Sequence, residues 1–140
     1  MAQNTTPIFT KAPIITWATA TTANTALDGT GTVYTCFTAD ATNGSYVQNL
    51  LVKASNTTAT SAAATLRIFI NNGSTAGTAS NNTLIREYTL TTVTASATAS
   101  TLNWEFPINL MLPASYVINV AIATMAGSSQ YALTCTGANY

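Results

Sequence analysis

The sequence predicts an all-β fold: an antiparallel two-sheet sandwich, jelly-roll-like, with about eight short strands. Apolar and polar residues alternate with a period of two, as they do in strands that bury one face. Clusters of Gly, Asn, Ser and Thr interrupt these segments at short intervals. Threonine, which is β-branched and favours strands, makes up about a fifth of the chain. We therefore place a single sandwich domain at residues 13–140, preceded by an extended N-terminal arm at residues 1–12.

The arm is the first element, and its apolar anchors are Ile8 and Phe9. A segment of this composition buries too little apolar area by itself to offset the entropy lost when it becomes ordered. We expect the arm to dock on a neighbouring protein, with Ile8, Phe9 and Lys11 as contacts. The alternative is a chain terminus without a role.

The strands follow the arm and are separated by turn signals. Asp28-Gly29, Asn43-Gly44 and Asn72-Gly73 supply the positive φ angles that tight turns need. Pro107 and Pro113 bracket Ile108–Leu112, which we interpret as a connection with a partly buried apolar patch. The predicted strands are Pro13–Trp17, Thr32–Thr38, Tyr46–Ala54, Thr65–Ile70, Leu84–Leu90, Leu102–Phe106, Tyr116–Ala123 and Tyr131–Thr136.

Alternation also predicts which side chains form the core. In three of the strands every second residue is large and apolar, and the residues between them are mostly polar. The predicted core residues are Leu66, Ile68, Ile70, Leu102, Trp104, Phe106, Ile118, Val120 and Ile122.

Charge is scarce, and this excludes several classes of partner. Charged residues make up 6% of the chain, against about 25% in an average soluble domain, and the formal net charge is zero. No basic patch is present to bind nucleic acid or an acidic membrane surface. The apolar stretch Ile108–Ala126 is interrupted by polar residues and proline, which favours a half-buried strand over a membrane span. Met1–Phe9 lacks the features of a signal peptide, so we expect folding in the cytosol.

Catalytic groups are also scarce. The chain contains no histidine, the commonest general base and metal ligand, so no catalytic residue, cofactor or metal ligand is predicted. Asp28 and Asp40 lie in turn-like contexts, where carboxylates accept local hydrogen bonds. Glu87 and Glu105 lie on strands and are candidate neighbours across a sheet. A glycosidase needs two carboxylates at a set separation, so this pair is a candidate for that role. The preferred interpretation is two solvated charges on strand faces.

Two further residue types leave alternatives open. Cys36 and Cys135 fit no metal-binding spacing, and we expect two separate buried thiols, with a single disulfide as the alternative. Trp17 and Trp104 are candidates for a sugar-binding platform. Trp104 lies on an apolar strand face and is expected in the core, whereas Trp17 is ambiguous and remains a candidate partner contact.

Three segments carry a resemblance to a known class of proteins. Arg67–Leu90 and Leu102–Thr124 resemble small β-sandwich proteins encoded among the structural genes of tailed bacteriophages. In these proteins a strand is followed by Leu-Pro-Ala, a small residue, Tyr and an alternating strand, as in Leu112–Val120 here. The opening segment Met1–Ala39 is similar as well.

The resemblance implies a non-enzymatic structural protein of the virion, assembled in the host cytoplasm. The expected role is that of a capsid decoration (cement) protein, which binds the major capsid protein or another virion protein and braces the head. It also implies a homo-oligomer, with a trimer favoured. The alternative is a tail or fibre module that binds glycan on the host surface.

Overall fold

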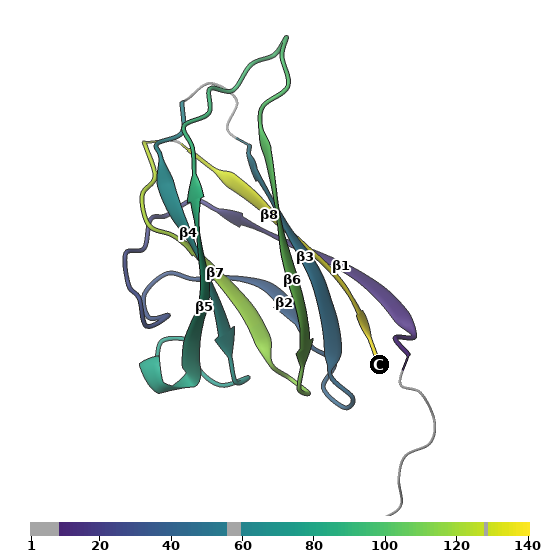
Figure 1. Ribbon diagram of the computed structural model, residues 1–140. Helices are drawn as coiled ribbons and strands as arrows, with labels where there is room; N and C mark the ends of the chain where they lie inside the picture. Colours follow the sequence, from purple (N-terminus) through teal and green to yellow (C-terminus); the bar gives the residue numbers. More distant parts are fainter. Residues whose placement is uncertain (1–8, 56–59, 128) are drawn as a thin grey trace, which may run out of the picture.

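The computed structural model describes residues 9–55, 60–127 and 129–140, which form a sandwich of two antiparallel sheets (Figure 1). Within these residues the only helical segment is one short 3-10 turn, η1 (Ala79–Asn81). The strands are β1 (Ala12–Ala20), β2 (Tyr34–Thr38), β3 (Ser45–Ala54), β4 (Ala64–Asn71), β5 (Asn82–Leu90), β6 (Asn103–Leu112), β7 (Val117–Ile122) and β8 (Tyr131–Asn139). The predicted all-β sandwich of eight strands is therefore confirmed.

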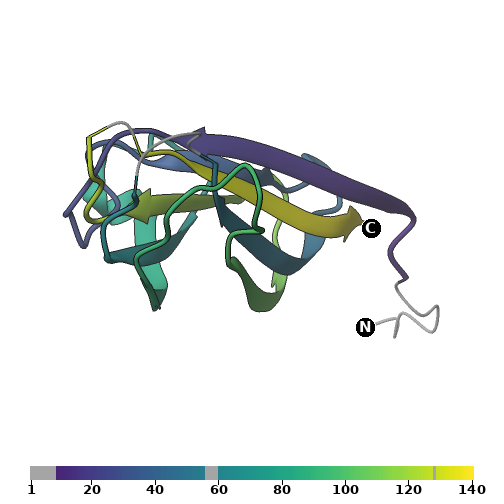
Figure 2. The same cartoon turned by 90° about the horizontal axis from the view of Figure 1, so that it is seen from above.

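The strand order is that of a jelly roll. Sheet A has the order β1-β8-β3-β6, and sheet B has the order β2-β7-β4-β5. Successive strands mostly alternate between the sheets, so the chain crosses repeatedly from one layer to the other. Figure 2 shows β1 beside β8 along one side of the molecule, where Ala12 pairs with Asn139 and Ala20 with Tyr131. The first and last strands of the fold thus lie side by side, with β1 at the edge of sheet A and β8 next to it.

The core lies between the inner faces of the two sheets, and most of its members were predicted. Leu66, Ile68, Ile118, Val120 and Ile122 are fully buried. The partly buried members that pack against them are Ile70, Trp104 and Phe106. The prediction for Leu102 is wrong, because β6 begins one residue later and leaves its side chain 53% exposed.

The predicted connection at Ile108–Leu112 is also wrong, because these residues form the second half of β6. β6 is the outermost strand of sheet A, where a proline N–H is not required for pairing, so Pro107 is accommodated inside the strand. A register irregularity between Val47 and Asn49 of β3 keeps the two strands paired past this point. Ile108 is consequently fully buried on the inner face.

The turns and the start of the domain follow the sequence closely. Gly29, Gly44 and Gly73 have positive φ angles of 76°, 77° and 87°, as predicted. At the first strand, the Lys11 N–H donates to the Asn139 carbonyl oxygen at 2.7 Å, and β1 begins at Ala12 rather than Pro13.

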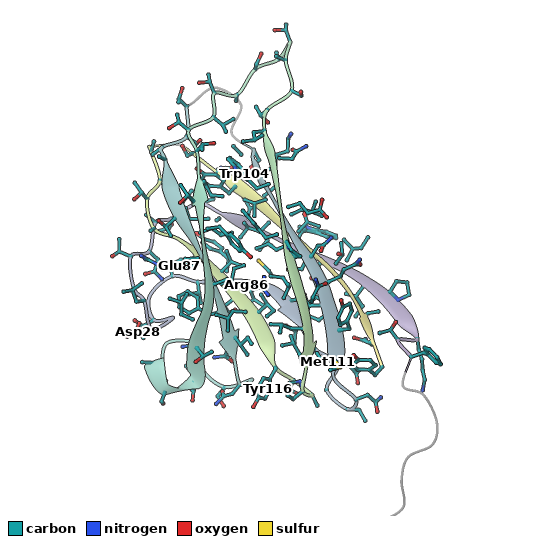
Figure 3. The ribbon with its side chains drawn as sticks, in the orientation of Figure 1. Asp28, Arg86, Glu87, Trp104, Met111 and Tyr116 are labelled. Carbon is teal, nitrogen blue, oxygen red and sulfur yellow. The ribbon has the colours of Figure 1, made fainter. Side chains whose placement is uncertain are left out.

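One side of the sandwich is closed by contacts between the outermost strands β5 and β6. The Arg86 guanidinium donates to the carbonyl oxygens of Pro107 (2.8 Å) and Ile108 (3.3 Å). Beside it, the rings of Tyr88 and Phe106 stack with their centroids 4.0 Å apart. Figure 3 shows Arg86 at this side, next to Glu87.

Candidate functional site

The outward surface of sheet A is the candidate site, and we call it the outer face. Pairing sets its side chains in rows that cross all four strands: in one row Trp17 lies beside Thr134, then Leu51, then Glu105. The outer face consists of Pro13, Ile15, Trp17 and Thr19 from β1, Ala132, Thr134, Thr136 and Ala138 from β8, Tyr46, Asn49, Leu51 and Lys53 from β3, and Asn103, Glu105, Pro107 and Met111 from β6.

Large apolar side chains gather on the outer face. Among the described residues seven large hydrophobic side chains are exposed, and four of them lie here. On β1, Ile15 is 65% exposed and Trp17 is 75% exposed, and Leu51 of β3 lies in the row of Trp17. Met111, 75% exposed, lies in a different row toward the end of β6. Figure 3 shows Met111 near the end of β6. Such a cluster on a sheet surface is typical of a protein-binding surface, since scattered apolar residues are the usual pattern.

Four polar side chains of the outer face form hydrogen bonds with each other in two pairs. Asn49 Nδ2 donates to Glu105 Oε1 at 2.6 Å. Lys53 Nζ donates to Asn103 Oδ1 at 2.8 Å. Both bonds join β3 to β6. The apolar residues on β1 and the centre of the sheet are therefore flanked, toward β6, by polar groups whose hydrogen bonds are already made.

The remaining acidic residues are also held locally. The Thr30 hydroxyl donates to the Asp28 carboxylate at 2.6 Å, and this bond lowers the pKa of Asp28. The Asn43 and Thr42 main-chain N–H groups donate to Asp40 and lower its pKa in the same way. These are the turn roles that the sequence predicted for both aspartates.

On sheet B, Arg67 and Glu87 form an ion pair at 2.8 Å, and Arg67 Nη1 also donates to the Thr25 carbonyl oxygen at 2.9 Å. Arg86 is held by β6 as described above. Seven of the eight charged side chains, all except Lys11, thus hydrogen-bond within the described chain.

The two glutamates considered as a catalytic pair are not neighbours across a sheet, and both are exposed, as the preferred interpretation of two solvated charges on strand faces expected. Glu87 lies on β5 in sheet B, whereas Glu105 lies on β6 in sheet A. Each has its own partner, Arg67 and Asn49 respectively. Among residues 9–55, 60–127 and 129–140, no group of three or more His, Cys, Asp and Glu side chains is arranged to hold a metal ion.

No helix in the described part of the chain is long and apolar enough to cross a membrane.

The predicted partner contacts are placed only in part. Trp17 lies exposed on the outer face, which resolves its ambiguity, and Phe9 is 73% exposed shortly before β1. Lys11 is exposed at the start of β1, and Ile8 lies outside the described residues. The sequence prediction missed Ile15 and the other apolar members of the outer face. The dipeptide Ile14-Ile15 contained a signal, because in a strand one of two adjacent apolar residues must point outward.

Fold and site together define an all-β sandwich protein with an apolar outer sheet face. No protein-family model and no curated protein matches the chain significantly. Its own residues must therefore supply the evidence for function.

Proposed function

We propose that this chain is a non-enzymatic structural protein of a virus particle, a decoration (cement) protein that attaches to the outside of a tailed-phage head. The outer face of sheet A is the attachment surface, with Trp17 and Ile15 on the edge strand β1 as its main anchors. The observation that carries the proposal is the cluster of exposed apolar side chains on this one face. The jelly roll is compatible with the role, since the fold recurs in viral capsid proteins, although it also occurs in lectins and other proteins.

The size of the outer face suits a stable contact. Four strands at the usual spacing, each about nine residues long, cover about 19 Å by about 30 Å, or roughly 600 Å² before side-chain relief is counted. A standard protein–protein interface buries about 800 Å² on each partner. Contacts from the segment before β1, where Phe9 is exposed, would extend the area toward that value.

The distribution of charge supports a protein partner rather than a strongly charged one. The two charged side chains of the outer face, Lys53 and Glu105, are opposite in sign and each bonds to a neighbouring amide, so the face has no net charge to attract a strongly charged partner. An interface core of this kind is depleted of free charge and enriched in Trp and Met. We propose a homo-oligomer on the head surface, with a trimer as the favoured form, on the basis of the resemblance to phage proteins.

A recognition module that binds host glycan is the second candidate. One observation favours it: the ring of Trp17 is exposed, and hydroxyl groups of Thr19 and Thr134 lie next to it. A sugar ring could stack there. However, a sugar platform usually combines several aromatic rings with free polar groups, and on this face the polar groups near Glu105 are already bonded. The protein-docking surface is therefore favoured.

The test is binding to heads from the phage that encodes the chain, prepared without this protein. The unmodified chain should sediment with the heads at a fixed ratio. In the double variant Ile15→Ser/Trp17→Ser, binding should weaken by about 30-fold or more, because loss of a buried aromatic anchor costs about 2 kcal/mol or more. The matched control is Leu27→Ser/Leu102→Ser, which removes two exposed apolar side chains outside the face and should bind normally.

Circular dichroism and the thermal transition of each variant show whether it is folded, and light scattering of the free chain should give three times 14.5 kDa. If both double variants bind equally well, the outer face is not the attachment surface. If the unmodified chain does not bind heads but binds a panel of cell-surface glycans through Trp17, the recognition module is correct instead.

A further inference from the structure

Cys36 on β2 and Cys135 on β8 are buried free thiols that belong to different sheets. The expectation of two buried free thiols is confirmed, and the two lie near each other, since Cys135 raises the pKa of Cys36. A β-bulge between Thr35 and Phe37 allows Cys36 and Phe37 both to point into the core. Strict alternation would bury only one of these two residues. The bulge therefore turns Cys36 toward sheet A.

The two sheets come close together beside this pair. Thr16, which pairs with Cys135, donates its hydroxyl hydrogen bond directly to the Cys36 carbonyl oxygen. A threonine hydroxyl is only two bonds from its Cα, so the backbones are nearer here than the ~10 Å between stacked sheets. Gly137 also lets β2 approach, since a Cβ there would lie 3.0 Å from the Phe37 ring. A disulfide between sheets requires such an approach.

We propose that Cys36 and Cys135 form a disulfide bond that ties sheet A to sheet B when the chain meets a peroxide oxidant. One thiolate attacks a peroxide oxygen, the O–O bond breaks, and a sulfenic acid forms while the departing hydroxide takes up the proton that the thiol had lost and leaves as water. The second thiol attacks the sulfenic sulfur, so the S–S bond forms and hydroxide leaves with the thiol proton as a second water. Two electrons from the thiols thereby reduce one hydrogen peroxide to two waters.

Burial makes this reaction selective and slow. The neighbouring Cys135 thiol, together with burial, raises the pKa of the Cys36 thiol well above its usual value, so little thiolate exists at neutral pH. Hydrogen peroxide is small, whereas glutathione disulfide is too large to enter a packed core without extensive opening. The bond forms whether or not the chain coats a virus head, so it can be tested independently of the proposed function.

The test uses the unmodified full chain, incubated with hydrogen peroxide under native conditions, then unfolded and alkylated with iodoacetamide. Its intact mass should fall by two hydrogens, and no alkyl group should be added. Its melting temperature should rise by about 10 °C, because the bond closes a loop of about 100 residues. Dithiothreitol should reverse both changes. The variants Cys36→Ala and Cys135→Ala, treated identically, should show no reversible rise.

Three outcomes would overturn the proposal. Two alkyl groups on every chain after prolonged exposure would mean that the thiols do not join. Added oxygen atoms on either cysteine would mean that oxidation proceeds without a disulfide. Covalent dimers on non-reducing electrophoresis would mean that the thiols react between chains and not across the sandwich.

Discussion

At the scale of single residues, Gly137 marks the place where backbone and core side chains press most closely on β8. A Cβ at this position would press against the Tyr46 carbonyl oxygen and lie 3.0 Å from the Phe37 ring. Gly137→Ala should therefore lower the free energy of unfolding by about 1–3 kcal/mol, as overpacking does. Urea unfolding followed by tryptophan fluorescence measures this change.

Gly77→Ala is the matched control. No heavy atom lies within 4 Å of a Cβ placed at Gly77, so the change should alter the free energy of unfolding by less than about 0.5 kcal/mol. Equal stability of the two variants would show that β8 can shift away from β3 and β2 at no cost.

The roles of turn residues were largely predictable from the sequence, whereas the burial of individual side chains was predicted less well. The aspartates at Asp28 and Asp40 and the glycine turns depend on interactions within two or three residues, and sequence alone identified them. Alternation separates two faces of a strand, but it does not say where the strand begins. For that reason Leu102 was assigned to the core although β6 starts after it.

At the scale of elements, Arg86 joins β5 to β6 where the two sheets meet. Arg86→Met keeps the aliphatic stem and removes the charged donors to the Pro107 and Ile108 carbonyl oxygens. We expect a loss of about 1–3 kcal/mol in the free energy of unfolding, the usual contribution of hydrogen bonds to charged groups.

Its neighbour in the sequence provides the comparison. Glu87→Gln removes the ion pair with Arg67, but this glutamate is largely exposed, so the cost should stay within about 1 kcal/mol. Thermal unfolding of both variants shows which substitution costs more stability, and we expect the greater loss for Arg86→Met. A greater loss for Glu87→Gln would mean that the ion pair within sheet B, and not the link between sheets, stabilises this side.

The eight strands were predictable because each carries its own alternation, but their partners were not. Sheet order brings β1 beside β8, and these strands are separated by most of the chain. The outer face depends on that order, since Trp17 and Leu51 share a row only through Thr134. The extension of β6 was missed because prolines normally end strands, and only its place at the edge permits Pro107.

At the scale of the whole molecule, stability should depend little on pH over the neutral range. The chain has no histidine. The folded pKa values of Asp28 and Asp40 lie below their usual 3.8, so their contribution is present above that value and is lost as pH falls through the folded pKa values. Melting temperature should be constant from about pH 5 to about pH 8 and fall below about pH 4.

Asp28→Asn/Asp40→Asn tests the cause of this acid limb. The double variant should lose less stability than the parent between about pH 4 and about pH 2, because its side chains no longer titrate. A steep change in melting temperature near neutrality would contradict the prediction, since no side chain with an ordinary pKa in that range is present.

The scarcity and balance of charge also bear on how fast the molecule would find the proposed partner. With 6% charged residues and a formal net charge of zero, the long-range field that orients an approaching chain is weak, so encounters should proceed by unaided diffusion at about 10⁵–10⁶ per molar per second. Counter-ions have correspondingly little to screen. If the proposed attachment is correct, the bound state should change little between dilute and concentrated salt, because its adhesion would come from apolar side chains.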